Sequence, residues 1–207
     1  NLETTFFSSM LSGIQHIASS AGYRVVICQS DESQQTEINH VQALMNNMID
    51  GLLICHSLTT NTFNHVTSNL NKGIPIIQFY RVNMDVPLPK VRCEDEPGAF
   101  EVTEHLIQQG CKRIALLLGP ENLFISNERF NGYKRAIDKY KIDWDDSLIA
   151  HVDFSKHAVE QTLEKWLTLN PAIDAIFSIS DKSGVEIIQM LKRKQINVPE
   201  TICVAGF

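Results

Sequence analysis

Hydrophobic positions along this chain follow two patterns that alternate from one end to the other. Short runs rich in Val and Ile, many of them apolar on both faces, are separated by longer segments in which apolar side chains recur about every 3.6 residues. The short runs are typical of strands buried between two layers of helices, and the longer segments are typical of amphipathic helices. Strands are therefore predicted at residues 23–30, 50–57, 74–81, 90–95, 113–120, 148–154, 174–180 and 201–207.

Helices are predicted between most of these strands. The segment 97–109 opens with Pro97 and stops at Gly110, as helices commonly do. Alternating strands and helices imply parallel sheets joined by right-handed crossovers, so the predicted fold class is α/β. The stretch VRCEDEPGAF, where a strand ends in carboxylates and a helix begins, divides the chain into lobes at residues 1–94 and 95–207. The predicted helices cover residues 5–21, 34–48, 97–109, 127–141, 157–168 and 182–194.

Residues directly after the predicted strands are the candidate ligand contacts, because ligands of parallel sheets bind beyond the carboxyl ends of the strands. Arg129 falls in the first turn of the predicted helix 127–141, where the helix macrodipole disfavours a cation by about 0.3–1 kcal/mol. Either a bound ligand or an ion pair with Glu128 or Glu121 accounts for a cation at that position. Asp181 opens the helix 182–194, where it either caps the helix or contacts a ligand.

Three further groups of side chains are candidates for a binding site. Phe6 and Phe154 suit the wall of a site for a ligand with apolar faces, such as a sugar ring, whereas Phe7 continues the apolar stripe of helix 5–21. Arg81 ends its strand and suits either a ligand contact or a salt bridge between the lobes. Asp31 suits a ligand contact, a turn or a helix cap.

The composition argues against several classes of protein. The formal net charge of −6 argues against a polyanion-binding surface, and the basic run at 192–194 suits the end of a helix. The five cysteines are odd in number and lack C-x-x-C spacing, so they are interpreted as small buried hydrophobes in a reducing compartment. The chain opens with no secretion-signal pattern and has no apolar run of membrane-spanning length. These observations favour a cytoplasmic protein.

The sequence lacks the motifs of common enzymes, among them G-x-G-x-x-G, the P-loop, G-x-S-x-G and H-E-x-x-H. Glu94-Asp95-Glu96 supplies neighbouring carboxylates, but adjacent residues at a strand end point to different faces, and Asp95 suits a helix cap. Several histidines lie on helical stretches without a ligand partner four residues on, and they are interpreted as surface or half-buried residues. These are His16, His40, His65, His105 and His157. No catalytic residue, cofactor or metal is therefore predicted.

One motif and several longer stretches point to a family. The motif R-x-x-G-Y-x-x-A runs from Arg129 to Ala136 and follows RIALLLGP. Stretches in the same order cover essentially the whole chain: FFSSMLSGIQHIASSAGYRVVICQSDE, DGLLI, GIPIIQFYR, GAFEVTEHLIQQGCKRIALLLGP, VDFS, SISD and VPETICVAGF. In these stretches and in their order, the chain resembles the effector-binding core of the lactose-repressor (LacI/GalR) family of bacterial transcriptional regulators.

The resemblance implies two Rossmann-like parallel-sheet lobes with a ligand cleft between them, the periplasmic-binding-protein-like type I fold. It implies as partners a small-molecule effector, a sugar or else a purine, and a second copy of the chain in a homodimer. Operator DNA is bound only through a helix-turn-helix domain that this chain does not contain, and no cofactor is expected. The positions that the resemblance assigns to the pocket or its surroundings are Phe6, Phe7, Asp31, Arg81, Arg129, Phe154 and Asp181.

The chain departs from the family pattern at Thr4-Thr5, Tyr80-Arg81, Glu94-Asp95 and Ser180, which leaves the identity of the sugar open. It is expected to be an incomplete fragment that lacks the DNA-reading domain, the first strand of the first lobe and the C-terminal return segment. The expected function is effector sensing in a regulator without enzymatic activity. The alternatives are a periplasmic sugar-binding protein of a transport system and an α/β enzyme with Glu94 or Asp181 as a base.

Overall fold

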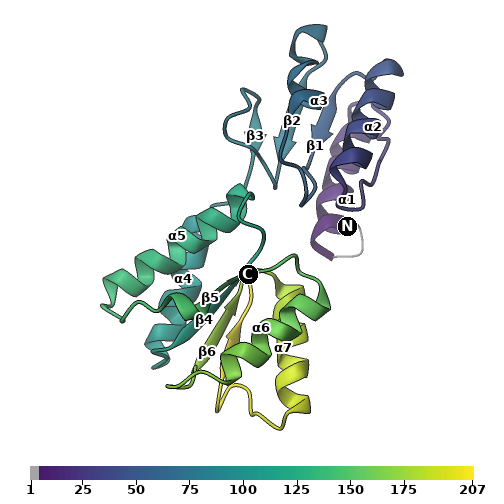
Figure 1. Cartoon of the computed structure of the whole chain (residues 1–207). Coiled ribbons are helices and arrows are strands. Elements are labelled where there is room, and N and C mark those ends of the chain that lie inside the picture. Colours follow the sequence, from purple (N-terminus) through teal and green to yellow (C-terminus); the bar gives the residue numbers. More distant parts are fainter. Residues whose placement is uncertain (1–4) are drawn as a thin grey trace. The chain divides into compact units, whose positions relative to one another are not determined.

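The computed structural model describes residues 5–207, which divide into two compact units (Figure 1). The first unit comprises the described residues up to Phe79 together with Asp85–Val91, and the second comprises Tyr80–Met84 and Arg92–Phe207. Each unit contains one parallel sheet with helices packed against it. The prediction of an α/β fold built from parallel-sheet lobes is confirmed. Thr4, one of the positions that depart from the family pattern, lies outside the described residues.

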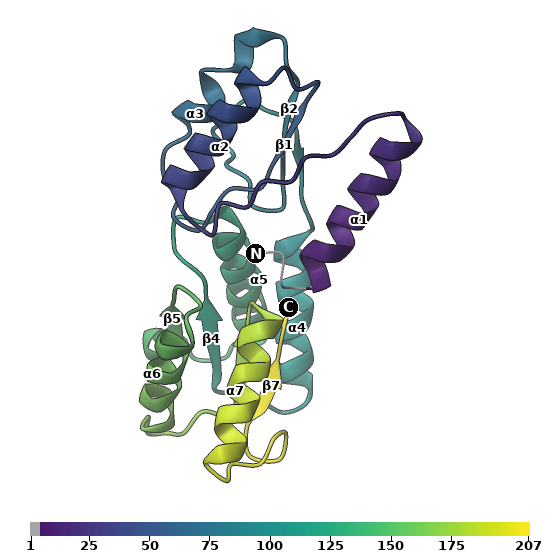
Figure 2. The same cartoon turned by 90° about the vertical axis from the view of Figure 1, so that its right-hand side faces the viewer.

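The first unit is built on a three-stranded parallel sheet in the order β1-β2-β3. Val41 of α2 and Val66 of α3 pack against Leu52, Ile54 and Ile76 on one face of this sheet. Figure 2 shows α2 and α3 on one side of the strands and α1 on the other. The elements are α1 (Thr5–Ser20), α2 (Gln34–Asn46), β1 (Leu52–Ile54), α3 (Asn64–Thr67), the short 3-10 helix η1 (Leu70–Lys72), β2 (Ile76–Phe79) and β3 (Lys90–Val91).

Residues 23–30, which the sequence predicts as a strand, belong to neither sheet in the described part of the chain. Tyr23, Val26 and Ile27 are 56%, 68% and 42% exposed. A strand is stabilised by hydrogen bonds and side-chain pairs with a neighbouring strand, and the described residues provide no such neighbour for this segment. The prediction of a strand at 23–30 is therefore wrong for this structure.

The second unit is built on a four-stranded parallel sheet in the order β5-β4-β6-β7. Helices α4 and α5 pack together on one face of this sheet, and α6 and α7 pack together on the other (Figure 1). The elements are α4 (Asp95–Gln108), β4 (Ile114–Leu118), α5 (Phe124–Lys139), the 3-10 helix η2 (Asp146–Leu148), β5 (Ile149–His151), α6 (Lys156–Leu167), β6 (Ala175–Ser178), α7 (Asp181–Arg193) and β7 (Cys203–Ala205).

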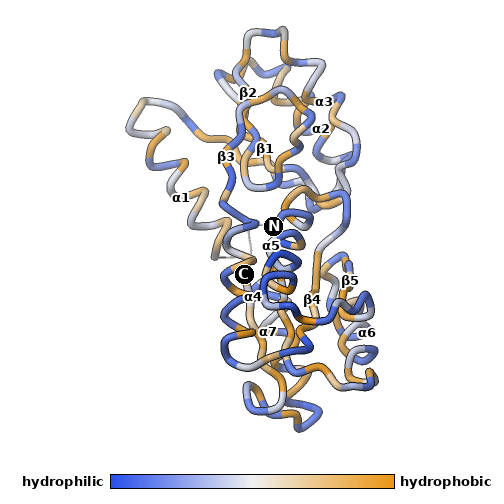
Figure 3. The backbone as a smooth tube through the Cα atoms, turned by 90° about the vertical axis from the view of Figure 1, so that its left-hand side faces the viewer, coloured by the Kyte–Doolittle hydropathy of each residue, from blue (hydrophilic) through white to orange (hydrophobic). Residues whose placement is uncertain are grey.

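Strand β4 is buried along its whole length because helices cover both faces of the sheet. Ile114, Leu116 and Leu118 pack into the core beneath α4 and α5. Ala115 and Leu117 pack into the core beneath α6 and α7, as expected from the alternation of side chains along a strand. Figure 3 shows β4 as a hydrophobic segment. Two separate cores therefore hold the carboxyl end of β4 in place.

Helices α4 and α5 approach each other closely at Gly132, the glycine of the R-x-x-G-Y motif. A Cβ atom at Gly132 would lie 2.2 Å from the carbonyl oxygen of Glu96 and 2.8 Å from the Cβ of Ala99. Only glycine leaves room for this contact between the two backbones. Gly132 therefore fixes the position of α5 against α4, and with it the position of Arg129, three residues earlier on the same helix.

Helix α5 begins at Phe124, three residues before the predicted start at residue 127. The residue before it, Leu123, makes no side-chain capping hydrogen bond, so the start lacks the usual sequence signal. Arg129 consequently lies in the second turn of the helix and not in the first. The predicted penalty from the macrodipole is therefore smaller, because that effect falls off within the first turn.

The prediction that all five cysteines are buried is wrong for two of them. Cys111 is buried and Cys55 and Cys203 are half-buried, but Cys28 and Cys93 are exposed. Cys28 lies in the segment 23–30 that joins no sheet, and Cys93 follows the short strand β3, so neither reaches a core. Among the described residues, no helix is both long enough and apolar enough to cross a membrane.

Candidate functional site

The carboxyl edge of the second sheet gathers several of the predicted site residues. Gly119 follows β4, Phe154 lies shortly after β5, Asp181 lies shortly after β6, and Phe207 lies shortly after β7. The four strands are parallel, so their carboxyl ends lie at the same edge. This edge is the usual place of a ligand in a parallel sheet.

Arg129 is the centre of a buried network at this edge. Oδ1 of Asp95 accepts hydrogen bonds from Nε and Nη2 of Arg129 at 2.9 and 2.8 Å, and the carbonyl oxygen of Ile179 accepts one from Nη1 at 2.5 Å. The ring of Phe207 lies against the guanidinium, with its centroid 3.6 Å from Cζ. Arg129 therefore joins α5 to the start of α4 and to the residues that follow β6 and β7.

Two predictions about this network are wrong. Arg129 does not pair with Glu128 or Glu121, since Glu128 pairs with Arg92 at 3.2 Å and the charged partner of Arg129 is Asp95. Asp95 does not cap α4, because it is the first residue of the helix and the preceding Glu94 makes no side-chain capping bond. The side chains of Arg129 and Asp95 are 6% and 3% exposed, so this is a buried ion pair.

Phe154 lies against the residue that follows β4. Its backbone has φ of +60°, an uncommon conformation for a non-glycine residue. A Cβ atom at Gly119 would lie 2.7 Å from the Phe154 ring and 2.9 Å from Oγ of Ser126. The hydroxyl of Ser126 is buried and has no hydrogen-bond partner among the described residues. Gly119 thus brings an aromatic face and an unpaired hydroxyl close together.

Asp181 is the first residue of α7 and is exposed. The preceding residue, Ser180, occupies the capping position and makes no side-chain capping bond. Asp181 also lies against the chain that follows β7, since a Cβ atom at Gly206 would lie 2.2 Å from its Oδ1. Its carboxylate therefore stands at the same edge as Arg129 and Phe154, with solvent access.

The other predicted site residues lie in different parts of the chain. Phe6 and Phe7 lie on α1 with their rings 5.6 Å apart in an edge-to-face arrangement, and Phe6 is exposed while Phe7 is half-buried. Asp31 is exposed and accepts a hydrogen bond from the Gln29 side chain at 2.7 Å. Arg81 is half-buried, with its guanidinium 5.9 Å from the centre of the Tyr80 ring. Their participation in one site with Arg129 stays a prediction.

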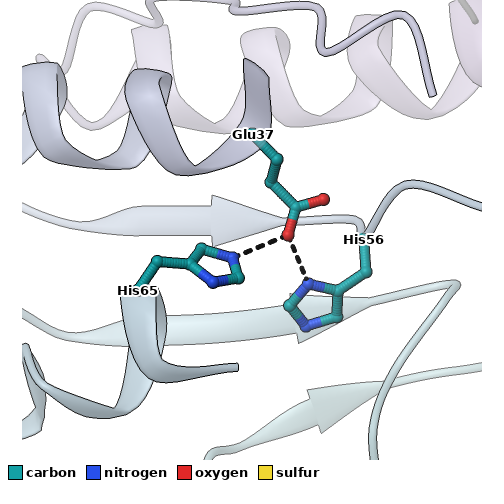
Figure 4. A group of neighbouring side chains, drawn as sticks. All are labelled: Glu37, His56 and His65. Carbon is teal, nitrogen blue, oxygen red and sulfur yellow. Dashed lines mark hydrogen bonds and ion pairs between the residues drawn. The ribbon is translucent and has the colours of Figure 1, made fainter. Parts of the chain in front are cut away.

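A cluster that the sequence did not predict lies in the first unit. Oε1 of Glu37 is 2.9 Å from Nδ1 of His56 and 2.8 Å from Nε2 of His65 (Figure 4). Oε2 of Glu37 accepts hydrogen bonds from the Ser57 amide at 2.6 Å and the Thr60 hydroxyl at 2.9 Å. All three charged or ionisable side chains of the cluster are buried. We call Glu37, His56 and His65 the histidine–glutamate cluster.

Hydrogen bonding outweighs burial in setting the pKa of Glu37. Burial alone raises the pKa of Glu37, but hydrogen bonds from His56 and His65 and from the Ser57 amide lower the pKa from 4.5 to about 2. Glu37 is therefore a carboxylate at neutral pH. Two imidazoles and a carboxylate are also a donor set that binds divalent transition metals. The position of His56 shortly after β1 was the one sequence signal for this site.

Comparisons with known proteins identify the family. The family model for "Periplasmic binding proteins and sugar binding domain of LacI family" matches residues 1–206. The ribose operon repressor of Halalkalibacterium halodurans is 27% identical over 208 residues, a match that covers 100% of this chain and 60% of the repressor. The chain spans about 60% of the length of the curated relatives it matches.

Solved structures show the same fold. The transcription regulator CcpA of Lactococcus lactis has a TM-score of 0.90 at 22% identity, with 100% of this chain and 74% of that chain covered. A periplasmic binding protein/LacI transcriptional regulator from Alkaliphilus metalliredigens, complexed with D-xylulofuranose, has a TM-score of 0.84 at 20% identity and the same coverage of 100% and 74%. These matches confirm the fold that the resemblance implied. Because the family model covers nearly every residue, the chain belongs to the family of periplasmic binding proteins and sugar-binding domains of LacI-type regulators.

Proposed function

We propose that this chain is the effector-binding part of a LacI-type DNA-binding transcriptional regulator and that its effector is a sugar. The family match over residues 1–206 carries the proposal. The ribose operon repressor and several other relatives matched over almost the whole chain are named as repressors or regulators, which favours a regulator over a transport protein. The coding sequence upstream of Asn1 tests the choice directly, since a helix-turn-helix supports the regulator and a secretion signal supports the transport protein.

The chemistry at the carboxyl edge of the second sheet supports a sugar. Asp181 offers an exposed carboxylate, which accepts hydrogen bonds from hydroxyl groups. Phe154 offers an aromatic face, against which the apolar face of a sugar ring can pack, and Ser126 beside it offers an unpaired hydroxyl. A guanidinium has five N–H donors, of which Arg129 uses three on Asp95 and Ile179. Two remain for a ligand.

The pairing of Arg129 with Asp95 favours an uncharged effector. The Asp95 carboxylate compensates the charge of Arg129 within the protein, so the site has less attraction for an anion than an unpaired arginine has. Asp95 is also one of the positions at which the chain departs from the family pattern. We therefore place neutral sugars ahead of sugar phosphates as effectors.

In the proposed protein, lobes at residues 1–94 and 95–207 enclose the effector, and Phe6, Phe7, Asp31 and Arg81 contribute to the same pocket. The protein is a cytoplasmic homodimer without enzymatic activity, and it binds operator DNA through a domain outside this chain. An effector that prefers one arrangement of the lobes shifts the dimer toward that arrangement. By linkage, operator affinity then changes by the same coupling free energy.

A thermal-shift screen of the chain against neutral pentoses, hexoses and disaccharides tests the proposed ligand class. A ligand at one hundred times its Kd stabilises the folded state by about 2.7 kcal/mol, which raises Tm by several degrees. Asp181→Ala should abolish the shift without lowering the Tm of the free protein, because Asp181 is exposed. Glu160→Ala, at an exposed position on α6, is the matched control and should respond like the wild type.

Two results would count against the proposal. If no sugar raises Tm or gives a calorimetric binding signal, the assignment of a sugar effector is wrong. If a sugar binds but Asp181→Ala binds it with unchanged affinity, the effector is a sugar and the assignment of the carboxyl edge as its contact surface is wrong.

A further inference from the structure

We propose that the histidine–glutamate cluster of the first unit is a binding site for a divalent transition-metal ion of the Zn²⁺ class. Nδ1 of His56, Nε2 of His65 and Oε1 of Glu37 come from the loop after β1, from α3 and from α2, and all three point toward one another (Figure 4). These atoms lie within 4.8 Å of one another. This inference is independent of the proposed sugar site.

The distances between the ligand atoms show what adjustment an ion requires. With bonds of about 2.0–2.1 Å in a tetrahedral arrangement, neighbouring ligand atoms lie about 3.3 Å apart. The carboxylate oxygen is now 2.9 Å from Nδ1 of His56 and 2.8 Å from Nε2 of His65. To hold an ion, the carboxylate oxygen would move outward by a few tenths of an ångström, and the two histidine nitrogens, which lie within 4.8 Å of each other, would approach to about 3.3 Å.

The hydrogen bond between Nε2 of His56 and Gln78 supports a cation between Nδ1 of His56 and Glu37. Nε2 of His56 lies 3.0 Å from Oε1 of Gln78, an amide oxygen that only accepts hydrogen bonds, so Nε2 carries the proton. In a neutral imidazole Nδ1 then presents a lone pair to the Glu37 carboxylate at 2.9 Å, and two electron-rich atoms at that distance repel each other. A positive species between them removes this repulsion, either a second proton on His56 or a metal ion.

The surrounding contacts hold the ligands in orientation, as outer partners do in metal sites. Gln78 fixes the tautomer and ring direction of His56, while the Ser57 amide and the Thr60 hydroxyl hold the second oxygen of Glu37. The site thus has three protein ligands, and a water molecule can supply the fourth.

An ion at this position would join three segments of the first unit. Helix α2 supplies Glu37, the loop after β1 supplies His56, and the four-residue helix α3 supplies His65. A helix as short as α3 has little stability of its own. We therefore expect a structural role for the metal, in which binding stabilises the first unit.

The test uses the whole chain, freed of metal with a chelator, partly unfolded in urea and refolded with one equivalent of Zn²⁺ or Co²⁺. Co²⁺ should give the visible absorption bands of a four-coordinate site, and Zn²⁺ should remove them and raise Tm. His65→Gln should weaken Co²⁺ binding more than tenfold. His40→Gln, the same change at a half-buried histidine of α2, should leave binding unchanged.

Several outcomes would overturn the proposal. If Co²⁺ gives only the weak spectrum of the hydrated ion, or if His65→Gln binds Co²⁺ as tightly as His40→Gln does, the cluster is not a metal site. If nitrogen NMR of the metal-free and Zn²⁺-treated chain shows both nitrogens of His56 protonated throughout, the positive species is a proton and not a metal. Anomalous scattering at the zinc edge from a Zn²⁺-treated crystal checks the position without any variant, and a signal elsewhere but not at this cluster refutes it.

Discussion

Replacing Asp95 by alanine tests whether the buried ion pair with Arg129 stabilises the second unit. The side chains of Arg129 and Asp95 are 6% and 3% exposed, so water cannot replace the lost carboxylate. After Asp95→Ala the guanidinium keeps the carbonyl oxygen of Ile179 and the ring of Phe207 as contacts at this edge. Removing one partner of a buried pair costs about 3–5 kcal/mol, whereas an exposed pair contributes about 0–1 kcal/mol.

Urea unfolding followed by tryptophan fluorescence measures this loss. Both tryptophans of the chain, Trp144 and Trp166, belong to the second unit, so their emission reports on the unit that contains the ion pair. With a urea m-value of about 1–3 kcal/mol per molar, a loss of about 3 kcal/mol lowers the midpoint by about 1 M or more. Asp138→Ala, which breaks the exposed pair with Lys134 on α5, is the control and should cost about 0.5 kcal/mol or less.

A double variant separates the unpaired charge from the loss of packing. Asp95→Ala combined with Arg129→Met leaves no buried charge without a partner, so it should be more stable than Asp95→Ala alone. A loss below about 1 kcal/mol for Asp95→Ala, which is the value of an exposed pair, would refute the reasoning. So would a double variant less stable than the single one, because packing and not charge would then dominate.

Three further expectations follow from particular contacts. Gly132→Ala should cost about 1–3 kcal/mol in urea unfolding because the added Cβ meets the backbone of α4, whereas Gly13→Ala, with no atom within 4 Å of the added Cβ, should be neutral or stabilising by circular dichroism. The pKa of Glu37 falls from 4.5 to about 2 on folding. About 3 kcal/mol of stability should therefore be present above pH 4.5 and be lost as the pH falls toward 2. In Glu37→Gln, Tm should depend less on pH over that range. The exposed Cys28 should be alkylated rapidly in the folded chain. Burial and the neighbouring thiol of Cys203 raise the pKa of Cys111 to about 12, so Cys111 should resist alkylation until the chain unfolds. Peptide mass spectrometry measures both rates, and equal rates would contradict this expectation.

Local patterns predicted the sheets because a strand that is buried on both faces has apolar residues at successive positions of the sequence. RIALLLGP is apolar at every position of β4 since helices cover both sides of that strand. The similar apolar run at 23–30 did not form a strand, because strand formation also depends on a neighbouring strand. The start of α5 was missed for a related reason, since Leu123 gives no capping signal.

Long-range pairing explains the misses at the sites. Arg129 was recognised as unusual, but its partner Asp95 lies 34 residues earlier and no local rule joins the two. Glu37 lies 19 residues from His56 and 28 from His65, so their spacing resembles no metal-binding motif. Only the fold brings such residues together. What the sequence did offer was the position of His56 near the end of a buried strand.

The exposed segment at 23–30 has a consequence for how the chain behaves in solution. Its exposed apolar side chains and a backbone that is paired with neither sheet form an open template to which another polypeptide can add a strand. A second molecule of the same chain carries the identical template, and mutual pairing becomes more favourable as the concentration rises. Oligomers formed in this way would reflect pairing between exposed segments, and they must be distinguished from any regulatory dimer before a measured mass is assigned to function.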